Sequence, residues 1–165
     1  MPTPEFILRL RREIGHKPLL LPGVTAVVIR RCDDGGTALE TPEVLLVRRA
    51  DSGAWSVTSG ILEPGEQPGA TAAREVLEET GVTAEPVRVA GVSDHGQVIY
   101  PNGDECWFTD ITFEMRYLSG APRVADDEST EVAWFRADRL PEPFTERHRE
   151  RIDWALDAGA AARFR

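Results

Sequence analysis

The fold of this chain is decided by the stretch GILEPGEQPGATAAREVLEETGV, which runs from Gly60 to Val82. It places a glutamate at position 66 and, after seven more residues, the run Arg74-Glu75-Val76-Leu77-Glu78-Glu79. Four carboxylates therefore lie in or beside one short segment. Their spacing is the kind that gathers acidic side chains around a helix, where oxygen ligands can hold a metal ion.

The residues near the ends of this stretch predict a helix that starts at Pro68 and ends before Gly81. Proline suits a first turn because its missing N–H costs no helical hydrogen bond there, and glycine suits a stop because it tolerates the left-handed conformation. Glu75, Glu78 and Glu79 stand at i, i+3 and i+4. We therefore expect the three carboxylates to converge on one face of the helix.

Three carboxylates on one patch repel one another, so the arrangement favours a divalent cation that neutralises them. Hard oxygen ligands favour Mg²⁺ or Mn²⁺. The alternative is a solvated, glutamate-rich helix face. That alternative is disfavoured because Arg74 is the only nearby cation, whereas a helix built for stability would carry Lys or Arg four residues after each Glu.

The pattern resembles, position for position, the signature box of the Nudix hydrolases, which cleave nucleoside diphosphates linked to a second group. The resemblance implies an α/β fold, a Nudix-type α/β/α sandwich in which a central mixed β-sheet lies between helical layers. It also implies that Mg²⁺ or Mn²⁺ is held by Glu75, Glu78, Glu79 and the backbone carbonyl of Gly60. These glutamates are therefore candidate catalytic residues as well as candidate metal ligands.

The same resemblance assigns supporting and proton-transfer roles around the metal. Arg74 and Glu66 are expected to orient the cluster of carboxylates. The general base stays open between Glu78 or Glu79 in the box and a carboxylate on a later loop. Glu128, which ends the acidic run Asp126-Asp127-Glu128, is the candidate from a later loop, with a solvated acidic turn as its alternative.

Several residues outside the box are candidates for substrate binding. Arg49 ends an expected strand, and in the sanitising nucleoside-triphosphatase branch of the family the second arginine of a similar Arg-Arg-Ala sequence faces the substrate. A surface role at the strand end is the alternative. Trp107 and Phe108 are candidates for stacking on a nucleobase, with core packing as the alternative for at least one of them, and Tyr100 is a further candidate of this kind.

Length and composition indicate one domain over residues 1–165. The chain has 165 residues, 41% of them hydrophobic, and can bury one sizeable core. Its net charge of −9, from 19 basic and 28 acidic residues, disfavours a long nucleic acid as partner but is compatible with a small nucleotide carried by a metal. We see no membrane-spanning run, and a homodimer is compatible with the pattern.

The remaining polar residues carry no separate motif. Cys32 and Cys106 lack paired metal-ligand spacing, so we expect both thiols to be buried as small apolar groups. Because no apolar signal segment opens the chain, we also expect a cytoplasmic protein. The three histidines are too widely spaced for a zinc motif and are expected in surface or capping roles. The alternating arginines and glutamates of 146–151 resemble an exposed, salt-bridged helix face.

Elsewhere the pattern predicts helices at both ends and strands between them. Residues 1–20 form an expected N-terminal helix and connector, with Thr3 as N-cap and Gly15 as the stop. Residues 144–161 form an expected closing helix. The expected strands cover 23–30, 44–49, 82–92, 95–100, 106–117 and 131–135.

These observations predict a Mg²⁺-dependent hydrolase that cleaves a pyrophosphate linkage by metal-activated water. A nucleoside triphosphate, a nucleotide sugar such as ADP-ribose and a dinucleoside polyphosphate all remain open as substrates. Two alternatives use the same fold. A non-catalytic nucleotide-sensing module would have little need for every carboxylate, and an isopentenyl-diphosphate-type isomerase needs a Cys and Glu pair that the sequence does not place.

Overall fold

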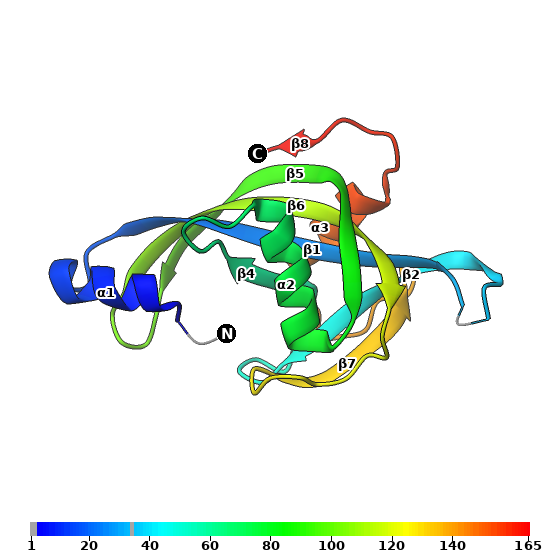
Figure 1. Cartoon of the computed structure of the whole chain (residues 1–165), viewed down its shortest axis with the longest axis horizontal. Coiled ribbons are helices and arrows are strands. Elements are labelled where there is room, and N and C mark those ends of the chain that lie inside the picture. The colour runs from blue at the N-terminus through cyan, green and yellow to red at the C-terminus, as the bar shows by residue number, and fades with distance from the viewer. Residues whose placement is uncertain (1–2, 34) are drawn as a thin grey trace.

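A central mixed sheet organises the molecule (Figure 1). The computed structural model describes residues 3–33 and 35–165. Within them the strands are β1 (Leu19–Cys32), β2 (Ala38–Arg49), β3 (Trp55–Ser56), β4 (Thr58–Ile61), β5 (Thr83–Ile99), β6 (Glu105–Ser119), β7 (Ser129–Arg136) and β8 (Arg163–Phe164). They pair in the order β3-β2-β1-β6-β5-β8, with β4 also on β1 and β7 on β2. The sheet is mixed because β1 and β6 are parallel whereas β5 and β6 are antiparallel.

Helices cover both faces of this sheet. They are α1 (Glu5–Ile14), α2 (Pro68–Thr80) and α3 (Glu146–Leu156). In the described part of the chain, none of them has the length and apolar character that crossing a bilayer requires. The expected α/β architecture with a central mixed sheet is confirmed.

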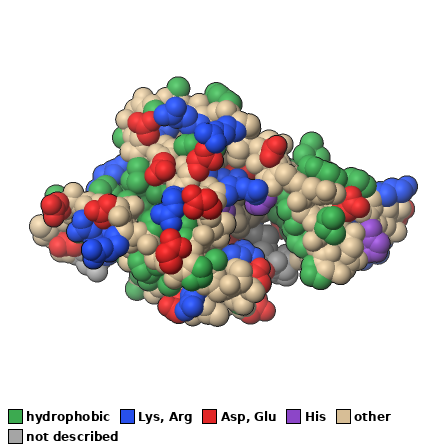
Figure 2. All heavy atoms as spheres, turned by 180° about the vertical axis from the view of Figure 1, so that it is seen from behind, with side chains coloured by type: hydrophobic (Ala, Val, Ile, Leu, Met, Phe, Trp, Pro, Cys, Tyr) green, Lys and Arg blue, Asp and Glu red, His purple; other side chains and the backbone are tan. Residues whose placement is uncertain are grey.

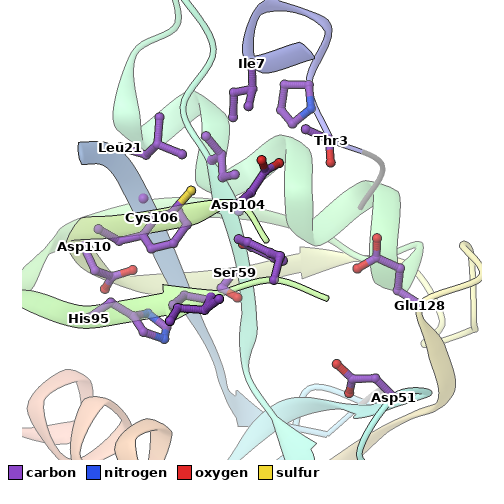
Figure 3. Close-up of a pocket in the computed structure, with 18 of the residues that line it drawn as sticks. Thr3, Ile7, Leu21, Asp51, Ser59, His95, Asp104, Cys106, Asp110 and Glu128 are labelled. Atoms are coloured by element: carbon purple, nitrogen blue, oxygen red, sulfur yellow. The ribbon is translucent and has the colours of Figure 1, made fainter. Parts of the chain in front are cut away.

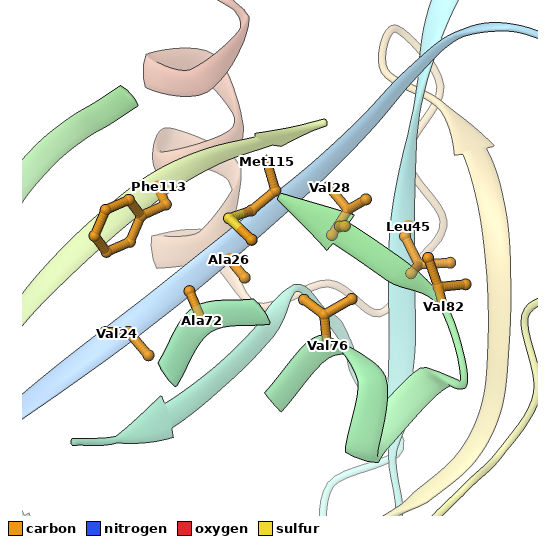
Figure 4. Close-up of a cluster of buried hydrophobic side chains, with 10 residues drawn as sticks. Val24, Ala26, Val28, Leu45, Ala72, Val76, Val82, Phe113 and Met115 are labelled. Atoms are coloured by element: carbon orange, nitrogen blue, oxygen red, sulfur yellow. The ribbon is translucent and has the colours of Figure 1, made fainter. Parts of the chain in front are cut away.

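Strand β1 is the centre of the core, and its alternating side chains serve the two faces separately. Val24, Ala26 and Val28 pack with the apolar side of α2, as Figure 4 shows. Val27 and Ile29 point to the opposite face and pack with α3. Since both faces are covered, β1 is an almost continuous apolar run rather than an alternating one.

Helix α2 has the bounds that its sequence predicts. It begins at Pro68 and is closed by Gly81, whose φ of 69° is left-handed and whose N–H donates to the carbonyl of Leu77. Ala72 and Val76 are fully buried on its inner side. This burial fixes the rotation of the helix and thereby decides which way its glutamates point.

The N-terminal part of the chain differs from the sequence-based expectation. Pro4, not Thr3, is the N-cap of α1, while Gly15 is the C-cap as expected. Residues 19–22 were expected to be a connector, but they belong to β1 because they pair in parallel with the start of β6. Helix α1 and the hairpin between β5 and β6 together form an arm that projects from the body (Figure 1). We call this unit the projecting arm.

Further corrections concern the C-terminal half and one cysteine. The closing helix was expected to reach residue 161, but α3 ends at Leu156, and Arg163–Phe164 then pairs beside β5. The strands expected at 82–92 and 95–100 are one strand, β5, interrupted by register shifts. Cys106 is buried as expected, whereas Cys32 is exposed. The sequence of residues 33–36 also predicts a turn, part of which lies outside the described residues.

Candidate active site

Gly60 brings the backbone of β4 directly against α2. It pairs with Val24 of β1, and a Cβ built on it would lie 2.3 Å from the carboxyl group of Glu75. A side chain at position 60 fits only if Glu75 moves, so close approach rather than an unusual φ favours glycine here. The first glycine and the first helical glutamate of the box are thus in contact.

Two of the three helical carboxylates are buried together. Glu75 is 1% exposed and Glu79 is 9% exposed. Burial raises the pKa of Glu75 to about 7, with Glu78 adding to the rise and Arg74 opposing it. Burial, followed by repulsion from Glu75 and Asp126, raises the pKa of Glu79 to about 8. Charging both groups in this place is therefore unfavourable without a cation.

Glu78 lies apart from this pair. Its side chain is 57% exposed and its Oε2 accepts a hydrogen bond of 2.9 Å from Arg74 Nη1. Across residues 3–33 and 35–165, no three His, Cys, Asp or Glu side chains come together closely enough to hold a metal ion. The expected convergence of three carboxylates is therefore not what the structure shows: two converge, and the third is held at the rim.

Arg74 and Glu66 fasten the loop before the helix to the helix itself. The guanidinium donates from Nε to Glu66 Oε1 at 2.8 Å and from Nη2 to Oε2 at 3.0 Å. Glu66 also accepts from the hydroxyl of Thr71 and the N–H of Glu63. Arg74 is the main reason that the pKa of Glu66 falls to about 2, so this carboxylate stays charged as a positioning group.

The buried pair fits a small divalent cation. Glu75 Oε1 is buried and accepts no hydrogen bond, although Arg74 Nη1 lies 3.0 Å away as an ion pair. Both candidate side-chain ligands offer only oxygen, which Mg²⁺ and Mn²⁺ prefer. Magnesium is commonly bound through one or two carboxylates together with substrate phosphates, so two buried carboxylates are sufficient for this chemistry.

A cavity of about 970 Å³ opens beside this cluster, between the projecting arm and the body of the molecule. Gly60 lies in its wall, and Figure 3 shows Ser59, Asp110 and His95 on one side of it and Asp51 and Glu128 on another. In the space-filling view the same region is a hollow with basic and histidine side chains at its edge (Figure 2). A nucleotide-sized ligand fits such a volume.

Arg49 and Glu128 connect the cavity to the carboxylates. Both line the large cavity, and both also line a small adjoining one of about 30 Å³ together with Glu79. Arg49 donates two hydrogen bonds, of 3.0 and 2.6 Å, to Asp51. The carbonyl of Glu128 accepts a 2.7 Å bond from the N–H of Ala50, which ties its loop to the end of β2. The structure thus brings both residues to the side of Glu79.

The two aromatic candidates are placed differently. Tyr100 lines the cavity, but Trp107 is not among its lining residues and Phe108 is. Successive side chains of a strand point to opposite faces, and in β6 the residues Cys106, Phe108 and Asp110 face the cavity. The ring of Phe108 lies 5.7 Å from that of His95 in a tilted pair.

Helix α3 supplies residues that sequence reasoning left out. His148 is 6% exposed and lines the cavity, and Arg151 is 1% exposed with Nη2 3.2 Å from Asp110 Oδ2. The expectation of an exposed, salt-bridged face is therefore wrong for these two, as is a surface role for His148. One signal was present: both share a helical face with the apolar Ile152 and Ala155.

The raised pKa values of Glu75 and Glu79 predict how stability depends on pH. Both lie above the ordinary value of 4.5, so the folded chain binds protons more tightly than the unfolded chain. In metal-free protein the free energy of unfolding is expected to fall as the pH rises from about 5 to about 8.

Urea unfolding at several pH values in the presence of a chelator measures this fall. Glu79→Gln is expected to flatten it and to raise stability at pH 8 by at least about 1 kcal/mol, the equivalent of roughly one pKa unit. Equal slopes for the variant and the wild-type protein would contradict the assignment of the buried charge.

The fold and the site define a class of protein: a hydrolase of phosphorus-containing acid anhydrides, with an acidic helix set against a glycine strand beside a large cavity. Comparison with known proteins agrees. The family profile of the NUDIX domain matches residues 21–155. The chain belongs to the Nudix family.

Individual relatives show how far the likeness extends. A MutT-like protein of Streptomyces ambofaciens is 34% identical over 146 residues, which cover 88% of this chain and 83% of that protein. The 8-oxo-dGDP phosphatase NUDT18 of Mus musculus is 32% identical over 146 residues, covering 85% of this chain but only 38% of that protein. These relatives support the family but differ in length.

Solved structures show the same fold. The crystal structure of a MutT NUDIX hydrolase from Burkholderia pseudomallei aligns with a TM-score of 0.61 and 26% identity, covering 82% of this chain and 98% of that one. The NUDIX domain of NrtR from Shewanella oneidensis, solved with ADP ribose, aligns with a TM-score of 0.61 and 21% identity, covering 95% of this chain and 98% of that one. At that identity the second likeness concerns the fold alone.

Proposed function

We propose that this protein is a Mg²⁺- or Mn²⁺-dependent hydrolase that cleaves a pyrophosphate linkage in a nucleoside diphosphate joined to another group. The observation that carries the proposal is the buried pair Glu75 and Glu79 beside a nucleotide-sized cavity, with Glu75 against Gly60 and Glu79 in the wall of the small adjoining cavity. Two buried carboxylates repel each other when charged, and a divalent cation would offset this repulsion, which supports the proposal.

The chain's own residues divide the work around such a cation. Glu75, Glu79 and the carbonyl of Gly60 would hold it, with Glu78 at the rim, where Arg74 now binds its carboxylate. A divalent cation, when bound, lowers the pKa of a water and screens the charge of the phosphates. Membership of the family and the donor set of oxygens support this assignment.

Substrate contacts come from the walls of the cavity. We assign phosphate binding to Arg49, and its position in the wall of the large cavity and of the small one that contains Glu79 supports this assignment. Phe108 and Tyr100 line the cavity whereas Trp107 does not, so of the two neighbouring aromatic residues we assign the stacking role to Phe108. We assign the general base to Glu128, and its position in the walls of both cavities supports this assignment.

The experiment that tests the function is a substrate panel with Mg²⁺, Mn²⁺ or chelator. Relatives named for 8-oxo-dGDP and 8-oxo-dGTP, and a structural neighbour solved with ADP ribose, suggest the first compounds. NADH and dinucleoside polyphosphates complete the panel. Metal-dependent release of a nucleoside monophosphate, inorganic phosphate or pyrophosphate supports the hydrolase, whereas tight binding without turnover of any compound would identify a sensing module.

Glu128→Gln tests the assignment of the general base. The change keeps the size of the side chain but removes its capacity to accept a proton, so kcat is expected to fall at least about 10-fold while KM stays nearly unchanged. Steady-state kinetics with the best substrate of the panel measures both. Unchanged kcat would return the base to Glu78 or Glu79 on α2.

Glu131→Gln provides the matched control for this variant. Glu131 lies in β7, just after the same loop, and pairs with Arg48 on the surface of the sheet. The change removes the same charge without touching the cavity. Its kcat is therefore expected to stay within about twofold of the wild-type value, since surface ion pairs contribute little.

A further inference from the structure

The first turn of α3 opens into the cavity. Thr145, Arg147 and His148 all line it. Thr145 is the N-cap of this 11-residue helix, and its side chain makes no capping hydrogen bond. The N–H of His148 donates to the carbonyl of Thr145, but the N–H groups of residues 146 and 147 have no acceptor within the helix. The positive end of a helix dipole is thus turned toward the cavity.

Buried polar groups at this place lack partners. His148 is 94% buried, since its exposed fraction is 6%, and its Nδ1 has no hydrogen-bond partner in the described part of the chain. One turn later Arg151 is almost fully buried, and its Nε and Nη1 also have no partner there. Buried polar atoms are usually satisfied, so the unpartnered Nδ1 of His148 in the cavity wall indicates a ligand with a polar group of its own.

The charges around His148 show which kind of ligand fits. Burial, together with Arg151, His95, Arg49 and Arg147, lowers the pKa of His148 to about 3. Arg49 is paired with Asp51 and Arg151 with Asp110.

Arg147 differs from these two arginines. Within residues 3–33 and 35–165 it forms no ion pair with a carboxylate, and its Nη1 donates to the carbonyl of His95 at 2.9 Å. The charge of Arg147 at this corner of the cavity is therefore not balanced by an ion pair within the described residues. An anion is the complementary ligand.

We propose that the first turn of α3 is a phosphate-binding subsite, separate from the carboxylates of α2, which holds a phosphate group that is not the one attacked. The identity of the substrate rests on the proposed function, whereas the binding of phosphate at α3 does not. Arg49 lies between the two places, because it lines the large cavity with Arg147 and the small one with Glu79. A substrate would extend from α2 past Arg49 to α3.

The proposal narrows the substrate class to nucleotides with a phosphate beyond the linkage that is cut. Two sources share this chemistry. One is a chain of three or more phosphates, and the other is a phosphate monoester elsewhere on the nucleoside. Arg147 and His148 are in this view specificity-determining residues for the same reaction.

Binding of inorganic phosphate and pyrophosphate to chelator-treated protein tests the subsite without hydrolysis. Isothermal titration is expected to find one site, and Arg147→Gln is expected to weaken it at least about 10-fold because a charge-assisted contact is lost. Arg149→Gln is the matched control. Arg149 lies on the same helix but pairs with Glu142 and Glu146, away from the cavity, and its loss is expected to weaken binding less than about twofold.

Three results would overturn the subsite. The first is that neither anion binds. The second is that Arg147→Gln and Arg149→Gln weaken binding equally, through net charge alone. The third is that Glu79→Gln abolishes binding because the anion lies at α2. If Arg147→Gln does not fold, the amide chemical shifts of the wild-type protein show whether phosphate binds at the first turn of α3. Added phosphate is expected to shift the N–H signals of residues 145–148, and shifts confined to α2 would contradict the proposal.

Matched substrates then separate the two sources. NADPH and NADH differ by one phosphate monoester, while ADP, ATP and adenosine tetraphosphate differ in chain length. We expect one of the two series to show a lower KM for the more phosphorylated member, and Arg147→Gln to abolish that difference. Equal KM values throughout both series would refute the role in specificity. Failure of the proposed function would instead appear as no hydrolysis of any compound while phosphate still binds.

Discussion

Glu79→Gln is expected to lower kcat at least about 100-fold, comparable with the loss of an electrostatic stabiliser of a transition state. The variant keeps the size of the side chain but replaces an accepting oxygen by an NH2 group and removes a buried negative charge beside Glu75. Glu75 alone is expected to bind a divalent cation less tightly than Glu75 and Glu79 do together. The measurement is the rate at saturating substrate over a range of Mg²⁺ concentrations.

The chelator decides between a metal role and a structural one. Chelator-treated wild-type protein is expected to be inactive and to recover with Mg²⁺ or Mn²⁺, whereas Glu79→Gln recovers little at any concentration. Glu78→Gln is measured for comparison with Glu79→Gln, because the side chain of Glu78 is exposed and its carboxylate is paired with Arg74. Full turnover of chelator-treated Glu79→Gln would refute the metal assignment.

Gly60→Ala is the second change with a large expected effect. The new Cβ would lie 2.3 Å from the carboxyl group of Glu75, so this side chain must leave its place. We expect kcat/KM to fall at least about 100-fold, while the loss of stability stays near 1–3 kcal/mol, as for other overpacked sites. The damage is expected in catalysis more than in folding because the displaced side chain is a candidate ligand.

A double variant isolates this contact. Glu75→Ala removes the atoms that the new methyl group would meet, so adding Gly60→Ala to it is expected to cost almost no further stability. The four proteins of this cycle are compared by urea unfolding. If Gly60→Ala lowers the free energy of unfolding equally in the wild-type protein and in Glu75→Ala, the local backbone requires the glycine and contact with Glu75 does not. Wild-type activity of the single variant would show that the loop is only a spacer.

Local signals account for the parts of the fold that the sequence predicts well. Pro68 and Gly81 bound α2 through their own backbone preferences, which act without the rest of the molecule. The apolar run at the centre of β1 identifies a strand covered on both faces. The spacing of the box likewise places Glu75, Glu78 and Glu79 on one helix. Each of these inferences involves residues that are close together in the chain.

Long-range pairing decides the features that sequence reasoning missed. The start of β1 at Leu19 depends on its partner strand β6, about ninety residues later. Alternation in β6 shows that Trp107 and Phe108 point to opposite sides, but only the position of the arm decides which side is the cavity. A charged helix face does not reveal that Arg151 is buried, because Asp110 on β6 supplies its partner.

The sequence by itself determined the family, the acidic helix and the identity of the candidate ligands, because these follow from residue type and from spacing within one turn or two. Only the tertiary structure decided that Glu75 and Glu79 are buried while Glu78 stays at the rim, and that α3 turns His148 into the cavity. The physical reason is that burial and electrostatic environment are set by neighbours distant in the chain, which spacing does not encode.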